Sequence, residues 1–367
     1  MPLLREGDKI RDTYEIERFL GEGAFAEVYR VQHRYLGRQA MKVFKKVGMT
    51  PQDVEAELSE ALLLSRIGHP NIVRVFDANT LETENGTCGY FTMEYVPGGT
   101  LHDYWKSFGR KFVPQEAAFD LIRQVCLGLS VAHRENPPVI HRDIKPQNIL
   151  VGYETTGLRA RLSDFGLAKR VNPLTLLASA AGTLCFKPPE VFEKGKTDSC
   201  AADVYALGVT LYLLLSDELP YEVDPTLGWG RQVAFDTVAK PPSFWNPELP
   251  REIDAFVSRC IALAPSERYP NAMATLEELQ KIDTTRHREL PSPSASLSRE
   301  SSKHALGPTS ELDAFKADAL AQEAVLLARN GRLADAADKM EEAMNNKPSL
   351  RSRYASRIRL WRNGISM

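Results

Sequence analysis

The chain has 367 residues, of which 43% are hydrophobic and 26% are charged, a composition typical of globular proteins. The length exceeds that of one ordinary hydrophobic core, so two or three folded units are expected. A net charge of −2 gives no overall argument for nucleic-acid or membrane binding, and we expect no nucleic-acid partner and no membrane span. Its five cysteines lie far apart without paired spacing, which favours reduced thiols in a cytoplasmic protein over a disulfide framework or a zinc site.

Strand patterns dominate the first part of the chain. Residues 14–20 alternate polar and apolar side chains, and further strands are expected over 28–31 and 40–44. Residues 52–67 change to helical spacing, with Pro51 near the start. We therefore expect a strand-rich lobe that carries one helix.

Helical periodicity dominates from about residue 100 to 282, most clearly over 115–132 and 203–215. The N-terminus lacks the pattern of a signal peptide, and the most apolar run, 207–215, is about half of what a membrane span needs. That run predicts a buried helix. A strand-rich lobe followed by a helix-rich lobe implies a cleft between them.

The C-terminal part differs in composition. Residues 284–310 contain seven serines and three prolines with few large apolar side chains, which predicts a flexible linker. Residues 311–367 are expected to form a small, separate, all-helical unit, because alanine-rich helical spacing resumes there.

A glycine-rich segment lies between the first two predicted strands. Gly21 and Gly23 let the backbone approach phosphate oxygens and present N–H groups to them. Ala26 stands where a third glycine of the G-x-G-x-x-G pattern would be, and taken alone the segment also fits an ordinary tight turn. Lys42 follows on the next predicted strand, where its ammonium group can reach back to the phosphates.

Two downstream motifs decide the interpretation. One runs from His141 through Asp143 to Asn148, and the other is Asp164-Phe-Gly166. With the glycine segment and Lys42, they resemble the eukaryotic-type (Hanks-type) protein kinase family. The resemblance implies an α+β, bilobal protein-kinase fold over residues 10–283, with an N-lobe of 10–96 and a C-lobe of 97–283.

The resemblance also implies the chemical roles. Asp143 orients the attacking hydroxyl and accepts its proton, and Lys145 neutralises the γ-phosphate of ATP. Asn148 and Asp164 hold Mg²⁺, for which Mn²⁺ can substitute, because oxygen ligands suit these hard cations. The segment Lys145-Pro-Gln-Asn148 is similar to the serine/threonine branch of the family.

Lys42 needs an acidic partner, for which the predicted helix offers two related positions. Counting back from His69-Pro-Asn-Ile-Val73, which resembles the family's H-P-N-I-V, favours Glu60. Glu57 is the alternative, since the two glutamates lie three residues apart on nearly the same face. By the same resemblance, Leu64 stacks with Phe165 and His141 in an apolar column.

The resemblance places the adenine between apolar side chains from both lobes. Met93 takes the gatekeeper position, and the backbone groups of Glu94 and Val96 bond the adenine edge. These apolar positions would be buried in a plain core as well, so burial alone does not test the assignment. The nucleotide-contacting residues that it implies are Leu20, Gly21, Gly23, Val28, Ala40, Lys42, Glu60, Met93, Glu94, Val96 and Leu150.

The segment 182–190 resembles the family's G-T-x-x-Y-x-A-P-E. It implies that Thr183 contacts Asp143 and Lys145, and that Glu190 forms a buried ion pair with Arg268. Asp203 would support the catalytic loop from below. Phe186 replaces the family's tyrosine and Pro188 its alanine, departures that affect the expected peptide preference.

Arg142 precedes the catalytic aspartate and suggests regulation. In the family such an arginine meets a phosphate on the activation segment, where Thr175 and Ser179 are the available hydroxyls. The alternative is that Arg142 bonds backbone carbonyls and the segment is ordered without modification.

The tail resembles one tetratricopeptide repeat over 317–350, with small residues such as Ala324 and Ala336 where two helices would cross. A plain alanine-rich hairpin is the alternative. Basic residues from Lys347 onward form a solvated face or meet an acidic protein. We expect this unit to bind a protein partner or to mediate self-association.

The chain is therefore interpreted as a cytoplasmic signalling enzyme, a serine/threonine kinase that transfers the γ-phosphoryl group of Mg·ATP to protein hydroxyls and autophosphorylates. A nucleotide-binding pseudokinase scaffold is the alternative, and the intact Lys42, Asp143, Asn148 and Asp164 weigh against it. A small-molecule kinase is less compatible with the segment 182–190.

Overall fold

The structure is a computed structural model in which two compact units are present, Met1–Ile282 and Asp283–Met367. The described residues are 2–109, 112–154, 157–165, 181–192, 199–221, 233, 235, 237–286, 320–321, 324–325, 327–328, 333–346, 354, 358 and 360–361. Within these ranges only the backbone is described for 60, 61, 64, 67, 153, 181–183, 283–286, 334, 338, 341, 342, 345 and 346.

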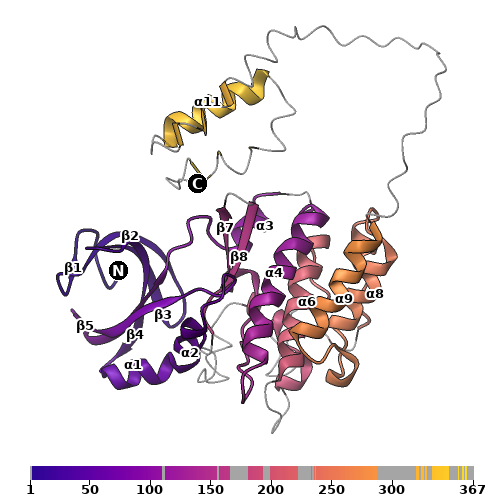
Figure 1. Cartoon of the computed structure of the whole chain (residues 1–367), viewed down its shortest axis with the longest axis horizontal. Coiled ribbons are helices and arrows are strands. Elements are labelled where there is room, and N and C mark those ends of the chain that lie inside the picture. The colour runs from indigo at the N-terminus through magenta and orange to yellow at the C-terminus, as the bar shows by residue number, and fades with distance from the viewer. Residues whose placement is uncertain are drawn as a thin grey trace. The chain divides into compact units, whose positions relative to one another are not determined.

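A six-stranded sheet forms the N-terminal lobe, with the order β1-β2-β3-β4-β6-β5 and antiparallel pairing between all neighbours (Figure 1). Two helices connect β4 to β5, and α1 lies against β5 and β6. The predicted strand-rich lobe is therefore confirmed. Its elements are β1 (Lys9–Ile10), β2 (Tyr14–Glu22), β3 (Ala26–His33), β4 (Gly37–Val47), α1 (Pro51–Glu57), α2 (Ser59–Ile67), β5 (Val75–Thr83) and β6 (Gly86–Glu94).

The alternation seen in the sequence corresponds to the two faces of this sheet. In β2, Tyr14 and Ile16 are buried while Glu15 between them is exposed. Tyr29 and Val31 of β3 belong to the same buried cluster. Because side chains of a strand alternate between faces, this pattern fixes which face of each strand covers the core.

The helix predicted over 52–67 is divided in two. Thr50 caps α1 with a reciprocal pair of bonds: its hydroxyl accepts from the N–H of Asp53, whose carboxylate accepts from the N–H of Thr50. At the other end the N–H of Leu58 is shared between the carbonyls of Val54 and Glu55. That tighter turn ends α1, and α2 begins at the next residue.

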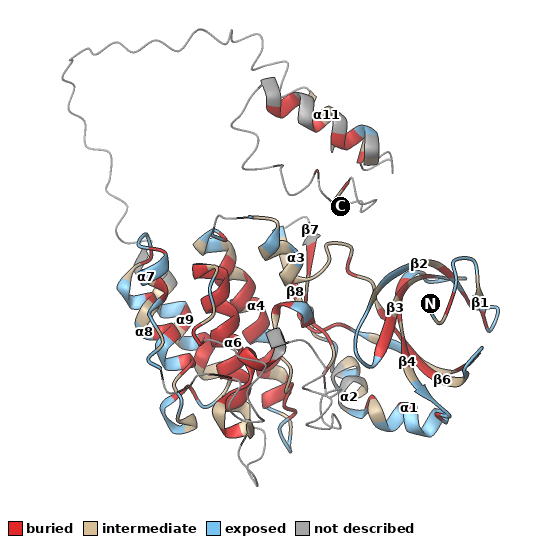
Figure 2. Cartoon of the chain, turned by 180° about the vertical axis from the view of Figure 1, so that it is seen from behind, coloured by how far each residue is buried: buried red, intermediate tan, exposed pale blue. Residues whose placement is uncertain are grey.

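The C-terminal lobe is mainly helical and is built around α6, in which every residue after Cys200 is buried (Figure 2). A helix that is apolar on all sides belongs inside a lobe. None of the described helices combines the length and apolar character needed to cross a membrane. The elements are α3 (Leu101–Lys106), α4 (Gln115–His133), η1 (Pro146–Asn148), β7 (Ile149–Glu154), β8 (Gly157–Leu162), η3 (Ala181–Phe186), η4 (Pro189–Phe192), α6 (Cys200–Ser216), α7 (Pro242–Trp245), α8 (Arg251–Cys260), η5 (Pro265–Glu267) and α9 (Ala272–Arg286).

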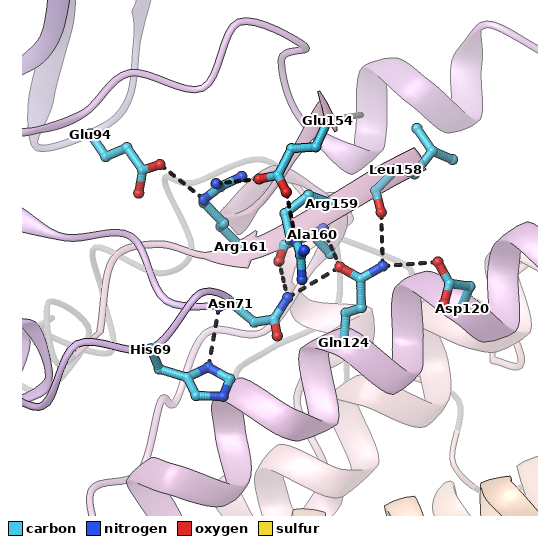
Figure 3. Close-up of polar contacts among 10 residues, drawn as sticks. All are labelled: His69, Asn71, Glu94, Asp120, Gln124, Glu154, Leu158, Arg159, Ala160 and Arg161. Atoms are coloured by element: carbon cyan, nitrogen blue, oxygen red, sulfur yellow. Dashed lines mark hydrogen bonds and ion pairs between the residues drawn. The ribbon is translucent and has the colours of Figure 1, made fainter. Parts of the chain in front are cut away.

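A buried polar network joins the loop after α2 to the helical lobe (Figure 3). The Nδ2 group of Asn71 donates to Gln124 Oε1 at 3.1 Å and to the carbonyl of Ala160 at 2.8 Å. Gln124 of α4 also accepts from the N–H of Ala160 at 3.0 Å. Gly128 lies where a Cβ atom would meet the Asn71 carbonyl oxygen at 2.7 Å, so this close approach requires glycine.

The second unit contains α11 (Leu333–Asn346) and its own apolar cluster. The small residues Ala324 and Ala336, singled out from the sequence, are fully buried in that cluster together with Met340 and Ala343. Trp361 is buried there as well. The assignment to a tetratricopeptide repeat stays a prediction, because much of 311–367 lies outside the described residues.

Candidate active site

The glycine segment connects β2 to β3 as a tight hairpin. The N–H of Gly23 donates to the carbonyl of Ala26 at 2.8 Å. A Cβ atom built on Gly21 would meet nothing within 4 Å, so the backbone there is open to a ligand. Ala26 itself is buried against the sheet, opposite Phe44 of β4. The backbone is thus open at Gly21, while the methyl group of Ala26 faces the core.

Lys42 lies on β4, directly opposite Val28 of β3. Its Nζ atom is 2.7 Å from Oδ1 of Asp164, and both side chains are mostly buried. Asp164 has the left-handed backbone angle φ of 63°, which a bulky residue rarely adopts. Glu60, the predicted partner of Lys42, lies on α2, but its side chain is not among those described, so that pair stays a prediction.

The loop that carries Asp143 is supported from beneath by Asp203 of α6. The two carboxylate oxygens of Asp203 accept from the N–H of His141 at 2.7 Å and from the N–H of Arg142 at 2.9 Å. His133 of α4 bonds Asp203 through Nε2 at 3.0 Å. Burial would raise the pKa of Asp203, but the hydrogen bond and charge of His133 outweigh it and lower the pKa below its usual value.

His141 connects this loop to the segment that carries Asp164. Its Nδ1 atom accepts from the N–H of Asp143, and its Nε2 atom bonds the carbonyl of Ser163 at 2.9 Å. This pattern requires a neutral ring, and burial lowers the pKa of His141 accordingly. The ring centroids of His141 and Phe165 lie 4.5 Å apart, so these two side chains are in contact as predicted. The side chain of Leu64, the third predicted member of this column, is not described.

Asp143 is surrounded by cations. Its Oδ2 atom lies 2.8 Å from Nζ of Lys145 and accepts from Nδ2 of Asn148 at 2.8 Å. Its Oδ1 atom lies 3.3 Å from Nζ of Lys187. Burial would raise the pKa of Asp143, but the charges of Lys187 and Lys145 outweigh it and hold the pKa well below its usual range. Asp143 is therefore ionised at neutral pH.

Asn148 and Asp164, the predicted metal ligands, lie on adjoining segments. The carbonyl of Asn148 accepts from the N–H of Ser163 at 3.0 Å and from its hydroxyl at 3.1 Å. A carboxylate and an amide oxygen fit Mg²⁺, which takes one or two protein ligands together with phosphate oxygens. The described residues contain no cluster of three or more His, Cys, Asp or Glu side chains that could hold a metal ion by themselves, so the assignment of Asn148 and Asp164 to Mg²⁺ stays a prediction.

The residues predicted to contact adenine come from both lobes and converge. Ala40 pairs with Met93 across β4 and β6, and both belong to one apolar cluster that Val28 and Leu150 join at its edge. Leu20 is partly exposed near the end of β2. The structure thus brings four of the predicted apolar residues together.

Glu94, at the end of β6, is held by both its backbone and its side chain. The N–H of Glu94 donates to the Arg74 carbonyl at 2.9 Å, and its carboxylate lies 3.0 Å from Nε of Arg161 (Figure 3). Arg161 of β8 also bonds Glu154 at 2.7 Å. Arg161 thereby links the segment between the lobes to the hairpin of β7 and β8.

The predicted ion pair between Glu190 and Arg268 is present and buried. Nη1 and Nη2 of Arg268 bond the two oxygens of Glu190 at 2.6 and 2.8 Å. The remaining donors of Arg268 meet the carbonyls of Ala201, Ala262 and Leu263. All five N–H groups of the guanidinium therefore have acceptors.

The predicted regulatory and substrate-contacting hydroxyls are not described. Thr183 lies in η3, but its side chain is outside the described set, as are residues Thr175 and Ser179 entirely. Arg142 donates through Nη1 to the carbonyl of Ile140 at 2.9 Å. The predicted roles of Thr183, Thr175 and Ser179 therefore stay predictions.

Sequence reasoning did not single out Lys187, Asn71, Gln124 or Arg161. Lys187 stands in a motif position without a fixed residue type, so only the folded turn reveals its proximity to Asp143. Asn71 was visible within His69-Pro-Asn-Ile-Val73, but its partner Gln124 is far away in the sequence.

Comparisons with known proteins agree with this geometry. The profile of the protein kinase domain matches residues 14–279. The chain is 31% identical over 280 residues to a probable serine/threonine-protein kinase of Clostridium acetobutylicum, covering 75% of this chain and 41% of that protein. It is 32% identical over 280 residues to the serine/threonine-protein kinase PknB of Mycolicibacterium smegmatis, covering 74% of this chain and 43% of that protein.

Solved structures agree with the fold. The crystal structure of a mutant PknI kinase domain of Mycobacterium tuberculosis superposes with a TM-score of 0.56 at 25% identity, covering 76% of this chain and 98% of that domain. The chain spans less than half the length of the curated relatives described above. The chain therefore belongs to the protein kinase family, and the relatives found for its kinase domain are serine/threonine kinases.

Proposed function

We propose that the chain transfers the γ-phosphoryl group of ATP to serine and threonine hydroxyls of proteins. The observation that carries this proposal is the convergence of charged groups around one point. Lys42 and Asp164 are ion-paired, and Asp143 is held by Lys145 and Asn148 on the adjoining loop. Phosphoryl transfer depends on positioning and charge compensation, which these groups supply.

The roles of the protein groups follow from their contacts. In the proposed transfer, the hydroxyl oxygen forms a new bond to the γ-phosphorus, the bond to the β–γ bridging oxygen breaks, and ADP leaves. The ionised Asp143 orients the hydroxyl and accepts its proton. Lys145, 2.8 Å from Asp143, neutralises charge on the transferring group, and Lys42 binds the phosphates from the opposite lobe.

Asn148 and Asp164 are the residues that would hold Mg²⁺. When bound, this ion neutralises negative charge on the phosphate oxygens. The nucleotide base would lie among Val28, Ala40, Met93 and Leu150, whose apolar cluster spans the two lobes. The backbone of Glu94 and Val96 would bond its edge.

Labelled γ-phosphate tests the proposal. The purified full chain should transfer label from Mg·ATP to itself or to a generic basic protein. Lys42→Met and Asp164→Asn should abolish transfer, because each removes charge aimed at the phosphates. Lys281→Met on α9, which removes an exposed lysine paired with Glu278, serves as a matched control and should transfer normally. An undiminished rate in either active-site variant would overturn the role of that residue.

The acceptor residue type is a separate question. Hydrolysis of the labelled product should give phosphoserine and phosphothreonine, as the segment Lys145-Pro-Gln-Asn148 suggests. A predominance of phosphotyrosine would refute this part of the proposal.

Autophosphorylation is proposed at Thr175 or Ser179. A phosphate there would form charge-assisted bonds to Arg142 and order the segment that presents the acceptor hydroxyl. Mass spectrometry should find the phosphate in active preparations, and the double alanine variant should be slower. Fully active enzyme with both hydroxyls unmodified would rule this out.

The C-terminal unit is proposed to bind a protein partner or a second copy of the chain. Its buried alanine cluster gives it a core of its own, and the residues proposed for phosphoryl transfer lie in the other unit. Residues 1–300 should therefore retain activity and melting temperature while losing self-association in light scattering or partner binding. A truncated form that is insoluble or melts far lower would show that the tail stabilises the kinase domain. None of the five cysteines is part of a disulfide, which fits the proposed cytoplasmic location.

A further inference from the structure

Lys187 is a buried lysine beside the catalytic loop that the proposed phosphoryl transfer does not use. It follows η3, and its N–H donates to the Leu184 carbonyl at 3.0 Å. Only 8% of the residue is exposed to solvent. Its Nζ atom donates to the carbonyl of Arg142 and lies 3.3 Å from Oδ1 of Asp143.

The two oxygens of Asp143 have different partners. Oδ2 contacts Lys145 and Asn148, each at 2.8 Å. Lys145 is assigned to the transferring phosphate in the proposed function, so nucleotide binding gives its ammonium group a competing acceptor. Asn148 is assigned to the metal ion through its amide oxygen, so its Nδ2 group can keep the bond to Asp143. Oδ1 contacts Lys187, which has no such assignment.

We propose that Lys187 is a positioning residue for phosphoryl transfer, which holds the Asp143 carboxylate in place while Lys145 engages the transferring phosphate. The inference rests on the proposed function. Lys187 acts through Asp143 and does not touch the substrate.

Burial supports this assignment. An ammonium group taken out of water is unfavourable unless charges and acceptors replace its hydration. Here the replacements are the carbonyl of Arg142 and the carboxylate of Asp143, two groups of the same loop. Lys187 therefore has little freedom to leave, and a fixed charge of this kind does not have to reorganise during the reaction.

Three variants of the full chain separate charge from packing. Lys187→Met keeps the length of the side chain without its charge. Lys187→Gln keeps a donor for the Arg142 carbonyl without the charge, and Lys187→Arg keeps the charge. Lys281→Met is again the surface control. The kinetic constants for ATP and for a generic basic protein are measured with Mg·ATP, beside thermal melts of each variant.

We expect Lys187→Met and Lys187→Gln to lower kcat by about 10²-fold, the loss that follows when a reacting group is misplaced by about 1 Å. The KM for ATP should stay within about twofold, because the nucleotide-binding groups are untouched. Lys187→Arg should recover most of kcat, and the control should match the wild type.

Several outcomes would overturn the inference. A kcat for Lys187→Met that is unchanged would show that Asp143 needs no such support, and a raised kcat would show that Lys187 blocks the hydroxyl site. A loss that follows the melting temperature and is not rescued by arginine would show a purely structural lysine. If the wild type transfers no phosphate, the proposed function fails first, so the two failures are distinguishable.

Discussion

The carboxylates of Asp143 and Glu190 lie in the same lobe and both have cationic partners, but they are held differently. Glu190 meets one guanidinium, and the side chains of Arg268 and Glu190 are 0% and 6% exposed. Asp143 meets two separate ammonium groups and one amide, and its side chain is 21% exposed. A planar fork with every donor occupied fixes a structure, whereas the single-point contact of the Lys145 ammonium group can be exchanged for a contact with a substrate.

The largest expected effect is on catalysis. Asp143→Asn should lower kcat by about 10²- to 10⁴-fold, the range for loss of a general base, with little change in melting temperature. The reason is that the amide keeps the size of the side chain but accepts no proton. Steady-state transfer of labelled phosphate and a thermal melt of the same preparation test both halves. If Asp143→Asn unfolded the chain, Asp143 would be needed for stability in the same way as Glu190, which would contradict the comparison.

The second prediction concerns the buried ion pair of Glu190 with Arg268, for which we expect an effect on stability. Arg268→Met should destabilise the chain by about 3–5 kcal/mol, because it leaves the buried Glu190 charge unpaired and removes the guanidinium donors from three backbone carbonyls. Urea denaturation followed by fluorescence measures the change. Removing both charges, with Glu190→Gln added, should recover part of the loss, and no recovery would contradict the pairwise explanation.

Asp203 is intermediate, since it is buried and also bonds the catalytic loop. Asp203→Asn should cost about 1–3 kcal/mol, because an amide cannot accept at both positions, and it should lower kcat as well. The pKa of Asp203 is lowered in the folded state, so its contribution is present above its ordinary pKa and is lost as pH falls through the folded value. Acid titration of stability should therefore be shallower in the variant. An equally steep titration would contradict this assignment.

The smallest effect is expected at the surface. Arg159→Ala removes a partly exposed pair with Glu154 and should cost about 0.2–1 kcal/mol, without affecting phosphate transfer. Denaturation at low and high salt measures it, since screening should remove most of the difference. A larger loss would mean that exposure is a poor guide to the strength of these pairs.

Much of the fold was predictable from sequence. The strands of the first lobe, the helices over 115–132 and 203–215, and the pairing of Glu190 with Arg268 appear as expected. Periodicity suffices to predict the strands and helices, because burial determines which residues of each element are apolar. The family motif suffices to predict the ion pair, because it identifies the sequence positions of both partners. The break between α1 and α2 was missed, since it depends on how the buried Leu58 shares its N–H between two carbonyls.

The site was predictable in part. The motifs indicated Asp143, Lys145, Asn148 and Asp164, and the structure places them on adjoining loops. The ion pair of Lys42 with Asp164 was not expected, because a contact between two lobes depends on their relative placement and not on local sequence. Lys187 was missed for a different reason: it belongs to the same lobe as Asp143 but is distant from it in sequence, and only the turn after η3 brings the two together.

The anchoring of Asn71 to Gln124 has a mechanical consequence. The loop after α2 is bonded to α4 and β8, and Ile72 forms a bridge with Leu162, so this loop moves with the helical lobe even though it follows an N-lobe helix. We therefore expect any rotation of the sheet toward the helical lobe to turn about an axis near Asn71. The end of α2 nearest Ile67 should then move less than α1, which lies farther from this anchor along the chain.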